Sequence, residues 1–337
     1  MSEQDKWNLE LVGALEAHQL LSGAAGLIDW GDLRIAHIDT GVTQHPVFSH
    51  GCLLLDQGRN FKESNDPPLD PMNYRGAPGH GTRTCSVLTG DLPGTYIGVA
   101  RSVPVVPFRV SDWVVLDTLL IEGERNAVAQ SLRHAVDVAG CSVASISLGA
   151  LFSNRALTQA VDHAYEAGII VVCAGGQFVE EVVYPARLDR TIGVGGVTAQ
   201  RNIWHTYASA EYIDVWAPAD DVWRANIMTG PGLNETEYSK GDGTSYATPH
   251  VAGAAAMWLM QHGAQLQQMY QERWQIVEAF RFLLRSTSSA ITGDTPPDNN
   301  TGILDMVALL QAPLPPVTDL VKREIPVYDN DFDEDDV

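Results

Sequence analysis

Residues 241–258 read GDGTSYATPHVAGAAAMW, a glycine- and threonine-rich entry followed by a run of small apolar residues. This pattern predicts an apolar helix that begins at Thr244 and runs to Met260, in spite of Pro249. Ser245 then lies in the first turn, where backbone N–H groups and the positive end of the helix dipole surround its hydroxyl. A serine in this place is also typical of an ordinary helix cap, so the position becomes informative only together with other segments.

On both sides of this segment, short apolar strands alternate with amphipathic helices. The alternation predicts an α/β three-layer sandwich, in which helices cover both faces of a mostly parallel central sheet. In such sheets, functional side chains gather at the carboxyl ends of the strands. The strands are expected at Leu33–Ile38, Val103–Val110, Ser142–Leu148, Gly168–Ala174, Thr191–Val197 and Tyr212–Trp216. The other helices are expected at Glu122–Ala139, Asn154–Ala167, Trp274–Leu284 and Leu304–Leu310.

Acidic residues dominate the charge of the chain. Lys and Arg total 21 and Asp and Glu total 42, so the formal net charge is −21. No large basic surface is available, which argues against nucleic-acid and membrane partners. We expect one domain over residues 1–311, with residues 1–14 as an N-terminal extension. Residues 312–337 are first proline-rich and then acidic, and predict a mobile tail that either only solubilises the protein or docks on a regulatory partner or on the domain itself.

Targeting signals and cysteine spacing favour a cytoplasmic protein. No apolar run approaches the roughly 18 residues of a transmembrane helix. The N-terminus lacks the basic and apolar regions of a secretory signal peptide. The four cysteines show neither a CxxC pair nor metal-ligand spacing, which favours reduced thiols. They are Cys52, Cys85, Cys141 and Cys173.

Two further segments combine with Ser245. The stretch RIAHIDTG (34–41) is an apolar strand that ends on Asp39, just before a glycine turn. The stretch GHGT (79–82) places His80 between two glycines, which let backbone pack close to the imidazole. Each segment is weak evidence alone, because many strands end in an aspartate that forms a turn. Together they give the chain order Asp, His, Ser, which is the order of the subtilisin triad.

The segments DTG, GHGT and GTSYATPHVAG resemble the three signature segments of the subtilisin-like (subtilase) serine proteases, over roughly residues 15–310. The resemblance implies that Ser245 attacks the scissile carbonyl, that His80 is its base and later its acid, and that Asp39 orients the imidazole. It also implies that SISLG (145–149) and VVCAGG (171–176) flank the substrate. The substrate-binding residues implied are Ser147, Leu148, Gly149, Ala174 and Gly175.

The chain departs from the family at the residue that stabilises the oxyanion. The family usually carries an asparagine after Ala-Gly, whereas this chain reads Ala174, Gly175, Gly176, Gln177. In subtilisin, removing that donor costs on the order of 10²–10³ in rate. Three alternatives stay open. Gln177 supplies the amide from the next position, or a backbone N–H, a water or another polar side chain does so with slower turnover, or the enzyme is much weakened or changed by engineering.

Specificity and metal binding are less determined by the sequence. Val183 would narrow the primary pocket and favour small side chains, whereas Glu180 and Glu181 would attract a basic residue if they faced it, so no preference is predicted. Secreted members often bind calcium, which needs several converging oxygens. The acidic residues here have no such spacing, so we expect no metal and no cofactor, with calcium as an alternative.

These observations predict a serine endopeptidase in the cytoplasm that carries out limited processing of a protein or peptide. One alternative is a binding or regulatory protein of the same fold with little or no activity. Another is an acyl-transferring peptide ligase or cyclase, which must exclude water. If Met1 is the native start, we expect no family-type prodomain before Asp39. We therefore expect another restraint, with residues 1–14 or the acidic tail lying in the cleft.

Overall fold

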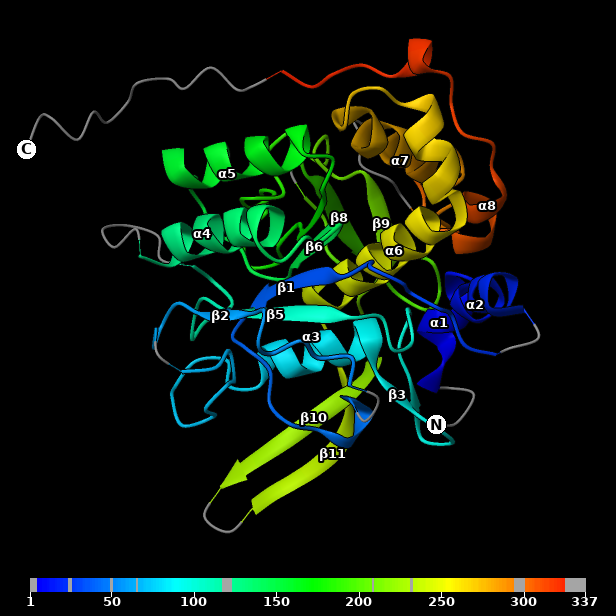
Figure 1. The fold of residues 1–337 in the computed structure, drawn as a ribbon. Coiled ribbons are helices and arrows are strands. Elements are labelled where there is room, and N and C mark those ends of the chain that lie inside the picture. Colours follow the sequence, from blue (N-terminus) through cyan, green and yellow to red (C-terminus); the bar gives the residue numbers. More distant parts are fainter. Residues whose placement is uncertain are drawn as a thin grey trace, which may run out of the picture.

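Seven parallel strands form the central sheet, in the order β2-β5-β1-β6-β7-β8-β9 (Figure 1). The computed structural model describes residues 5–23, 26–48, 51–64, 66–116, 123–207, 209–230, 233–293 and 301–324. The strands are β1 (Ile35–Asp39), β2 (Arg59–Asn60), β5 (Val105–Arg109), β6 (Val143–Ile146), β7 (Ile170–Ala174), β8 (Ile192–Val197) and β9 (Val215–Pro218). Two hairpins lie outside this sheet, β3 (Asp91–Leu92) with β4 (Tyr96–Ile97), and β10 (Val222–Gly230) with β11 (Leu233–Gly241).

Helices cover both faces of the sheet, which confirms the predicted sandwich. Helices α4 and α5 pack together on one face, and α3 and α6 pack together on the other. The helices are α1 (Trp7–Leu11), α2 (Ala14–Ser22), α3 (His80–Thr89), α4 (Gly123–Asp137), α5 (Arg155–Glu166), α6 (Thr244–Met269), α7 (Trp274–Ser286) and α8 (Met306–Gln311), with 3-10 turns η3 (Pro46–Phe48) and η4 (Val317–Asp319). Within the described residues, none of these helices has the length and apolarity that crossing a bilayer requires.

The six predicted strands and the predicted helices are all present, with shifted ends. Helix α6 runs on to Met269, and β9 begins at Val215 rather than Tyr212. Glu122, the predicted first residue of α4, lies outside the described residues. The β10–β11 hairpin was not predicted, although the sequence has a Gly-Pro-Gly run at 230–232, a pattern typical of turns. All four cysteines are buried and free, in agreement with their spacing.

Strand β1 is buried on both faces and divides the core in two. Ile35 belongs to the apolar cluster that contains α6 and α7, whereas Ala36 and Ile38 belong to the cluster that contains α4 and α5. Because side chains alternate along a strand, His37 and Asp39 share the face of Ile35 and meet α3. The strand thus sends two polar side chains, both almost fully buried, toward the helix that begins with His80.

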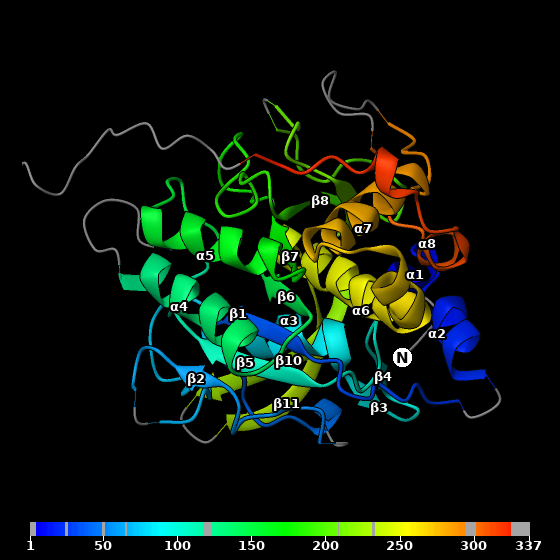
Figure 2. The same cartoon turned by 45° about the horizontal axis from the view of Figure 1, so that its top comes forward.

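The N-terminal segment packs against α6 and α8. Asn8 on α1 contacts the ring of His250 in α6, with Nδ2 and Nε2 2.9 Å apart. The N–H of Met306 donates to the carbonyl of Val12. Figure 2 shows α1 and α2 beside α8 and α6. The expectation that residues 1–14 lie in the cleft is therefore wrong for residues 5–14, while residues 1–4 lie outside the described residues.

The C-terminal segment is ordered further than the sequence suggests. Residues 312–324 run from α8 past α7 toward α5 (Figure 1). The Tyr270 hydroxyl donates to the carbonyl of Pro315 at 2.8 Å, and Arg190 donates to the carbonyl of Arg323 at 2.8 Å. The expected mobile tail is therefore wrong for residues 312–324, because proline-fixed extended backbone offers carbonyls to donors on the domain. Residues 325–337 lie outside the described residues.

Leu320 anchors this C-terminal segment, and its truncation should destabilise the fold. Leu320 is 9% exposed and joins the core of α6 and α7, whereas its neighbour Val321 is 74% exposed. We predict that Leu320→Ala lowers the free energy of unfolding by about 1–3 kcal/mol. The matched variant Val321→Ala should change it by less than about 0.5 kcal/mol. Urea denaturation measures both, and equal effects would show that the segment does not pack on the core.

Candidate active site

Asp39 and His80 form a buried pair at the carboxyl end of β1. His80 is the first residue of α3, and its Nδ1 lies 2.7 Å from Asp39 Oδ1. The Thr40 N–H donates to the same oxygen at 2.7 Å. Burial alone would raise the pKa of Asp39, but the charge of His80 and the hydrogen bonds from His80 and Thr40 hold it below its usual value. The carboxylate therefore stays ionised although it is 0% exposed.

Asp70 fixes the segments on either side of this pair. One oxygen of its buried carboxylate accepts hydrogen bonds from the Thr40 hydroxyl at 2.8 Å and from the Gly79 N–H at 2.7 Å. The Gly81 N–H in turn donates to the Thr40 hydroxyl at 3.0 Å. The residues next to Asp39 and His80 are thus tied together. The sequence alone does not reveal this role of Asp70, because its partners Thr40 and Gly79 are distant from it in the chain.

Ser245 stands in the first turn of α6, as predicted, and is linked to the end of β6. Its hydroxyl donates to the carbonyl of Ser147 at 3.0 Å, and the Ser147 hydroxyl donates to the carbonyl of Ser245 at 2.9 Å. The second bond explains why α6 tolerates Pro249. A proline has no N–H to donate to the carbonyl four residues earlier, so Ser147 satisfies that buried carbonyl instead.

The three predicted side chains are placed on neighbouring elements at the carboxyl ends of β1 and β6. Strands β1 and β6 are parallel neighbours, and Ile38 pairs with Ile146, so Asp39 and Ser147 are the next positions along adjacent strands. Neighbouring strands lie about 4.8 Å apart. His80 is held by Asp39, and Ser245 by Ser147. Helices α3 and α6, whose first turns contain His80 and Ser245, pack against each other.

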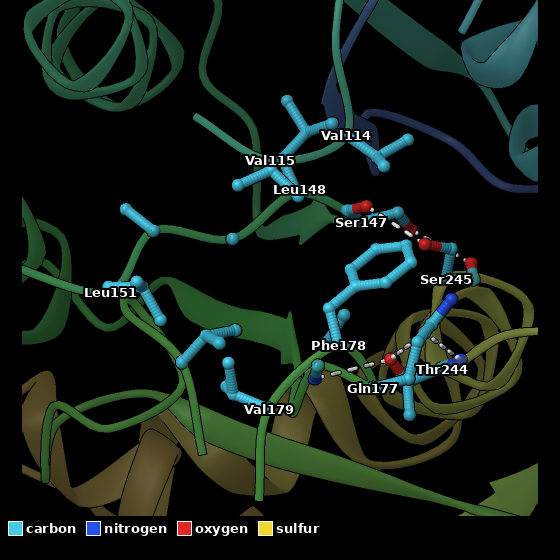
Figure 3. A pocket seen from close by; sticks show the side chains of 15 residues that line it. Val114, Val115, Ser147, Leu148, Leu151, Gln177, Phe178, Val179, Thr244 and Ser245 are labelled. Carbon is cyan, nitrogen blue, oxygen red and sulfur yellow. Dashed lines mark hydrogen bonds between the residues drawn. The ribbon is translucent and has the colours of Figure 1, made fainter. Parts of the chain in front are cut away.

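Gln177 caps the N-terminus of α6. Its Oε1 accepts hydrogen bonds from the N–H and the hydroxyl of Thr244, at 3.1 and 3.0 Å. Its Nε2 lies over Gly243, where an added Cβ would be 3.1 Å away. The amide is thus held beside the residue that precedes Ser245, and Figure 3 shows Gln177 next to Thr244 and Ser245.

Gly176 cannot carry the side chain that the family has at its position. Its φ is 95°, in the left-handed region, and an added Cβ would lie 2.9 Å from a methyl group of Val183. The N–H of Gly176 donates to the Thr244 hydroxyl at 3.2 Å. Gly176 therefore has no side-chain donor to offer to a substrate, and its N–H is already used by Thr244 in this structure.

An apolar pocket of about 220 Å³ opens beside Ser245 (Figure 3). Of the residues predicted to bind substrate, all but Gly175 line it. The Tyr207 hydroxyl occupies the space where a Gly175 side chain would be, 2.6 Å from an added Cβ. Phe178, which is 69% exposed, stands at the rim. The predicted residues on the pocket wall are Ser147, Leu148, Gly149 and Ala174.

Val183 fills the space between the two walls of the pocket. Its N–H donates to the carbonyl of Gly175 at 3.0 Å, and the next residue pairs with Ala150. A Cβ added to Gly149 would lie 2.4 Å from one methyl group of Val183, and a Cβ added to Gly176 would lie 2.9 Å from the other. The valine therefore closes the slot between the chains that follow β6 and β7. Glu180 and Glu181 are exposed and do not line the pocket.

The backbone beside the pocket is already paired. The Gly149 N–H donates to the carbonyl of Val114 at 3.0 Å, and the Leu116 N–H donates to the carbonyl of Gly149 at 2.7 Å. The expected pairing of a substrate strand with Gly149 is thus not open in this structure, because the chain's own segment at Val114–Leu116 uses both groups. Sequence analysis did not identify this segment.

Two acidic side chains of the surrounding loops pair with basic ones. Asp91 contacts Arg101 at 3.1 Å, and Glu181 contacts Arg187 at 3.6 Å. In the part of the chain that the structure describes, no cluster of three or more His, Cys, Asp and Glu side chains has the arrangement of a metal site.

Comparison with known proteins identifies the family. Residues 31–302 match the Subtilase family of S8 peptidases. The chain is 27% identical over 274 residues to the major intracellular serine protease of Bacillus subtilis (strain 168), covering 76% of each protein. It is 31% identical over 255 residues to subtilisin BL of Lederbergia lenta, covering 74% of this chain and 82% of that one. A solved protease from Pseudoalteromonas arctica shares the fold, with a TM-score of 0.73 and 20% identity over 91% of this chain and 96% of that one.

A subtilisin-like α/β fold with these segments defines a class of hydrolase, the serine peptidases of subtilisin type. The chain belongs to the subtilase family and is a serine endopeptidase of that family.

Proposed function

We propose that this peptidase cleaves peptide bonds with Asp39, His80 and Ser245 as a catalytic triad. The observation that supports this most is the 2.7 Å contact between His80 and the ionised Asp39, at the edge of the sheet where Ser147 holds Ser245. In the free enzyme the Ser245 hydroxyl donates to Ser147. Substrate binding turns it toward Nε2 of His80, in keeping with the looser contacts common in free active sites.

The reaction then follows from the protonation states of these groups. Ser245 Oγ bonds to the carbonyl carbon while His80 Nε2 takes the hydroxyl proton. The C–N bond breaks as His80 returns this proton to the leaving amine, which leaves an acyl-enzyme on Ser245. A water molecule, deprotonated by His80, releases the acyl group as a carboxylate. Asp39 stabilises the imidazolium in both halves of the reaction without taking its proton.

Gln177 is our candidate for the oxyanion donor. Because its Oε1 is held by Thr244, its Nε2 is directed away from that cap and along the first turn of α6. The Ser245 N–H lies in the same turn, whose first amides have no partner within the helix. These two donors take the place of the asparagine that Gly176 and Val183 exclude.

The pocket favours a small or medium-sized apolar side chain next to the scissile bond. Its wall offers little polar surface, so a charged side chain would lose its hydration without a partner. Val183 limits its depth by contact with both Gly149 and Gly176. An extended peptide must also take over the hydrogen bonds that Gly149 makes with Val114 and Leu116.

The setting that we propose is limited processing of a protein or peptide in the cytoplasm, without a metal or cofactor. One relative of this chain is named an intracellular protease, which supports the compartment. No metal or cofactor is needed in this proposal, because residues of the chain itself fill the roles of nucleophile, base and oxyanion donor. The two alternatives are a weakly active binding protein of the same fold and an acyl-transferring ligase. The shielded, apolar pocket favours the ligase only if an amine competes with water for the acyl-enzyme.

The triad is tested by covalent labelling. We predict that a fluorophosphonate probe labels the wild-type chain. Ser245→Ala should abolish this labelling and lower peptidase activity by at least about 10³-fold. A chain that binds peptides but takes no label would be the binding protein. Mass spectrometry of the products with an added amine nucleophile separates hydrolysis from ligation.

The role of Gln177 is tested by two substitutions that separate capping from donation. Gln177→Ala should lower kcat by about 10- to 10³-fold with little change in KM, because it removes an oxyanion donor. Gln177→Glu keeps the acceptor that caps Thr244 but replaces the donor with an oxygen. We expect Glu to lose as much activity as Ala, whereas full activity in the Glu variant would show that Gln177 only caps the helix.

The depth of the pocket is tested at Val183. Val183→Ala should change the substrate preference of the enzyme. The ratio of kcat/KM for a peptide with a large apolar residue before the scissile bond to kcat/KM for a peptide with alanine there should rise roughly tenfold. The neighbouring Val182→Ala, at a buried position that does not line the pocket, is the matched control. Unchanged preference in the Val183 variant, measured on a peptide library, would place the specificity determinant elsewhere.

A further inference from the structure

A second histidine lies behind the triad, on the same strand as Asp39. His37 is 1% exposed, and its Nε2 lies 2.9 Å from the hydroxyl of Thr84 on α3. The same nitrogen lies 4.0 Å from Asp39 Oδ2. Thr84 is one turn along α3 from His80 and is itself fully buried. No role in the reaction proposed above accounts for these two residues.

The direction of the hydrogen bonds follows from the available acceptors. The Thr84 hydroxyl has one proton and three acceptors within 3.2 Å, which are Asp39 Oδ2 at 3.1 Å and the carbonyls of His80 and Gly81. Asp39 is the only charged acceptor among them, and a bond to an ionised group is stronger than one to a carbonyl. Thr84 therefore donates to Asp39 and accepts from His37, whose proton sits on Nε2.

His37 stays neutral in this position. Burial lowers its pKa to about 4, against the opposing effect of the Asp39 charge. With the proton on Nε2, the bare Nδ1 is an acceptor, and it is buried without a hydrogen-bond partner in the described part of the chain. An acceptor that is buried without a partner destabilises the fold compared with an apolar side chain. What His37 supplies in return is the donor that orients the Thr84 hydroxyl.

Both oxygens of Asp39 are held by this arrangement. Oδ1 accepts hydrogen bonds from Thr40 and His80, and Oδ2 accepts from Thr84. A carboxylate fixed at one oxygen can rotate about its Cβ–Cγ bond, whereas one fixed at both cannot. The plane of Asp39, and with it the ring of His80, is therefore set by α3 and β1 together.

We propose that His37 and Thr84 are a positioning pair, which locks the plane of the Asp39 carboxylate and thereby tunes His80 as a base. The inference rests on the proposed triad. Two other groups act on Asp39 through Thr40. Asp70 accepts from the Thr40 hydroxyl, and Arg109 from β5 donates to its carbonyl. On α3, the neutral thiol of Cys85 also faces the carboxylate. These groups are unchanged in the variants below.

Thr84→Val is the central test, because valine keeps the shape of threonine and loses the hydroxyl. Without the donor at Oδ2, the charge on Asp39 is less dispersed and stabilises the His80 imidazolium more. The pKa of His80 then rises, and the acidic limb of the pH profile of kcat/KM should move up by about half a pH unit. We expect kcat at its plateau to fall roughly tenfold, because the ring is less well oriented. KM should stay within about twofold of the wild type.

Conservative variants separate positioning from folding. Thr84→Ser keeps the hydroxyl, and His37→Gln keeps an N–H donor to it. Both variants should retain the wild-type pH profile of kcat/KM. His37→Val should show the shift of Thr84→Val in part, and the double variant should match Thr84→Val, since the two residues act as a unit. Thr89→Val is the matched control, because it removes another buried hydroxyl of α3, bonded to Val103. It should lower stability without moving the pH profile.

A readout independent of activity keeps this inference distinct from the triad itself. Histidine-labelled protein in the Ser245→Ala background allows the pKa of His80 and the tautomer of His37 to be measured by NMR. A raised His80 pKa in Thr84→Val would support the pair even if the chain proved to be inactive. An unchanged His80 pKa together with an unchanged pH profile, or a His37 proton on Nδ1, would overturn it.

Discussion

A single ionised carboxylate without access to water determines how the rest of the site is built. Asp39 is fully buried at the end of β1, so it needs several hydrogen bonds to stay charged. Its surroundings supply them from separate elements. Thr40 follows it in the chain, and His80 and Thr84 come from α3, where Thr84 is itself bonded to His37 of β1. The end of β1 and the start of α3 are consequently fixed relative to each other, as the proton transfer proposed for His80 requires.

The absent asparagine and the shape of the pocket have one common origin. Val183 occupies the space between Gly149 and Gly176, so it excludes a side chain at 176 and closes the slot beside it. Its place is set by backbone bonds, since its own N–H reaches Gly175 and the next residue pairs with Ala150. The side chain at 183 is therefore part of the pocket wall and also fills the space next to Gly176.

Much of the fold could be predicted from the sequence, because hydrophobic period and glycine turns are local signals. The strand that ends on Asp39 and the helix that starts at Thr244 are of this kind. What could not be predicted depends on contacts between distant residues. The role of Asp70, the pairing of Gly149 with Val114, and the anchoring of Leu320 all require the folded chain. The mobile tail was assigned from composition, which does not reveal that Tyr270 and Arg190 offer donors to its carbonyls.

The proline in α6 has a mechanical consequence for this enzyme. Where Pro249 interrupts the bonding of the helix, the missing contact is replaced by one to Ser147, so the first turn of α6 is fastened to the wall of the pocket rather than to itself. A peptide that displaces Val114 and Leu116 from Gly149 loads the chain two residues from that fastening. The wall of the pocket and the proposed nucleophile are thus connected through Ser147, which lies two residues before Gly149 and shares two hydrogen bonds with Ser245.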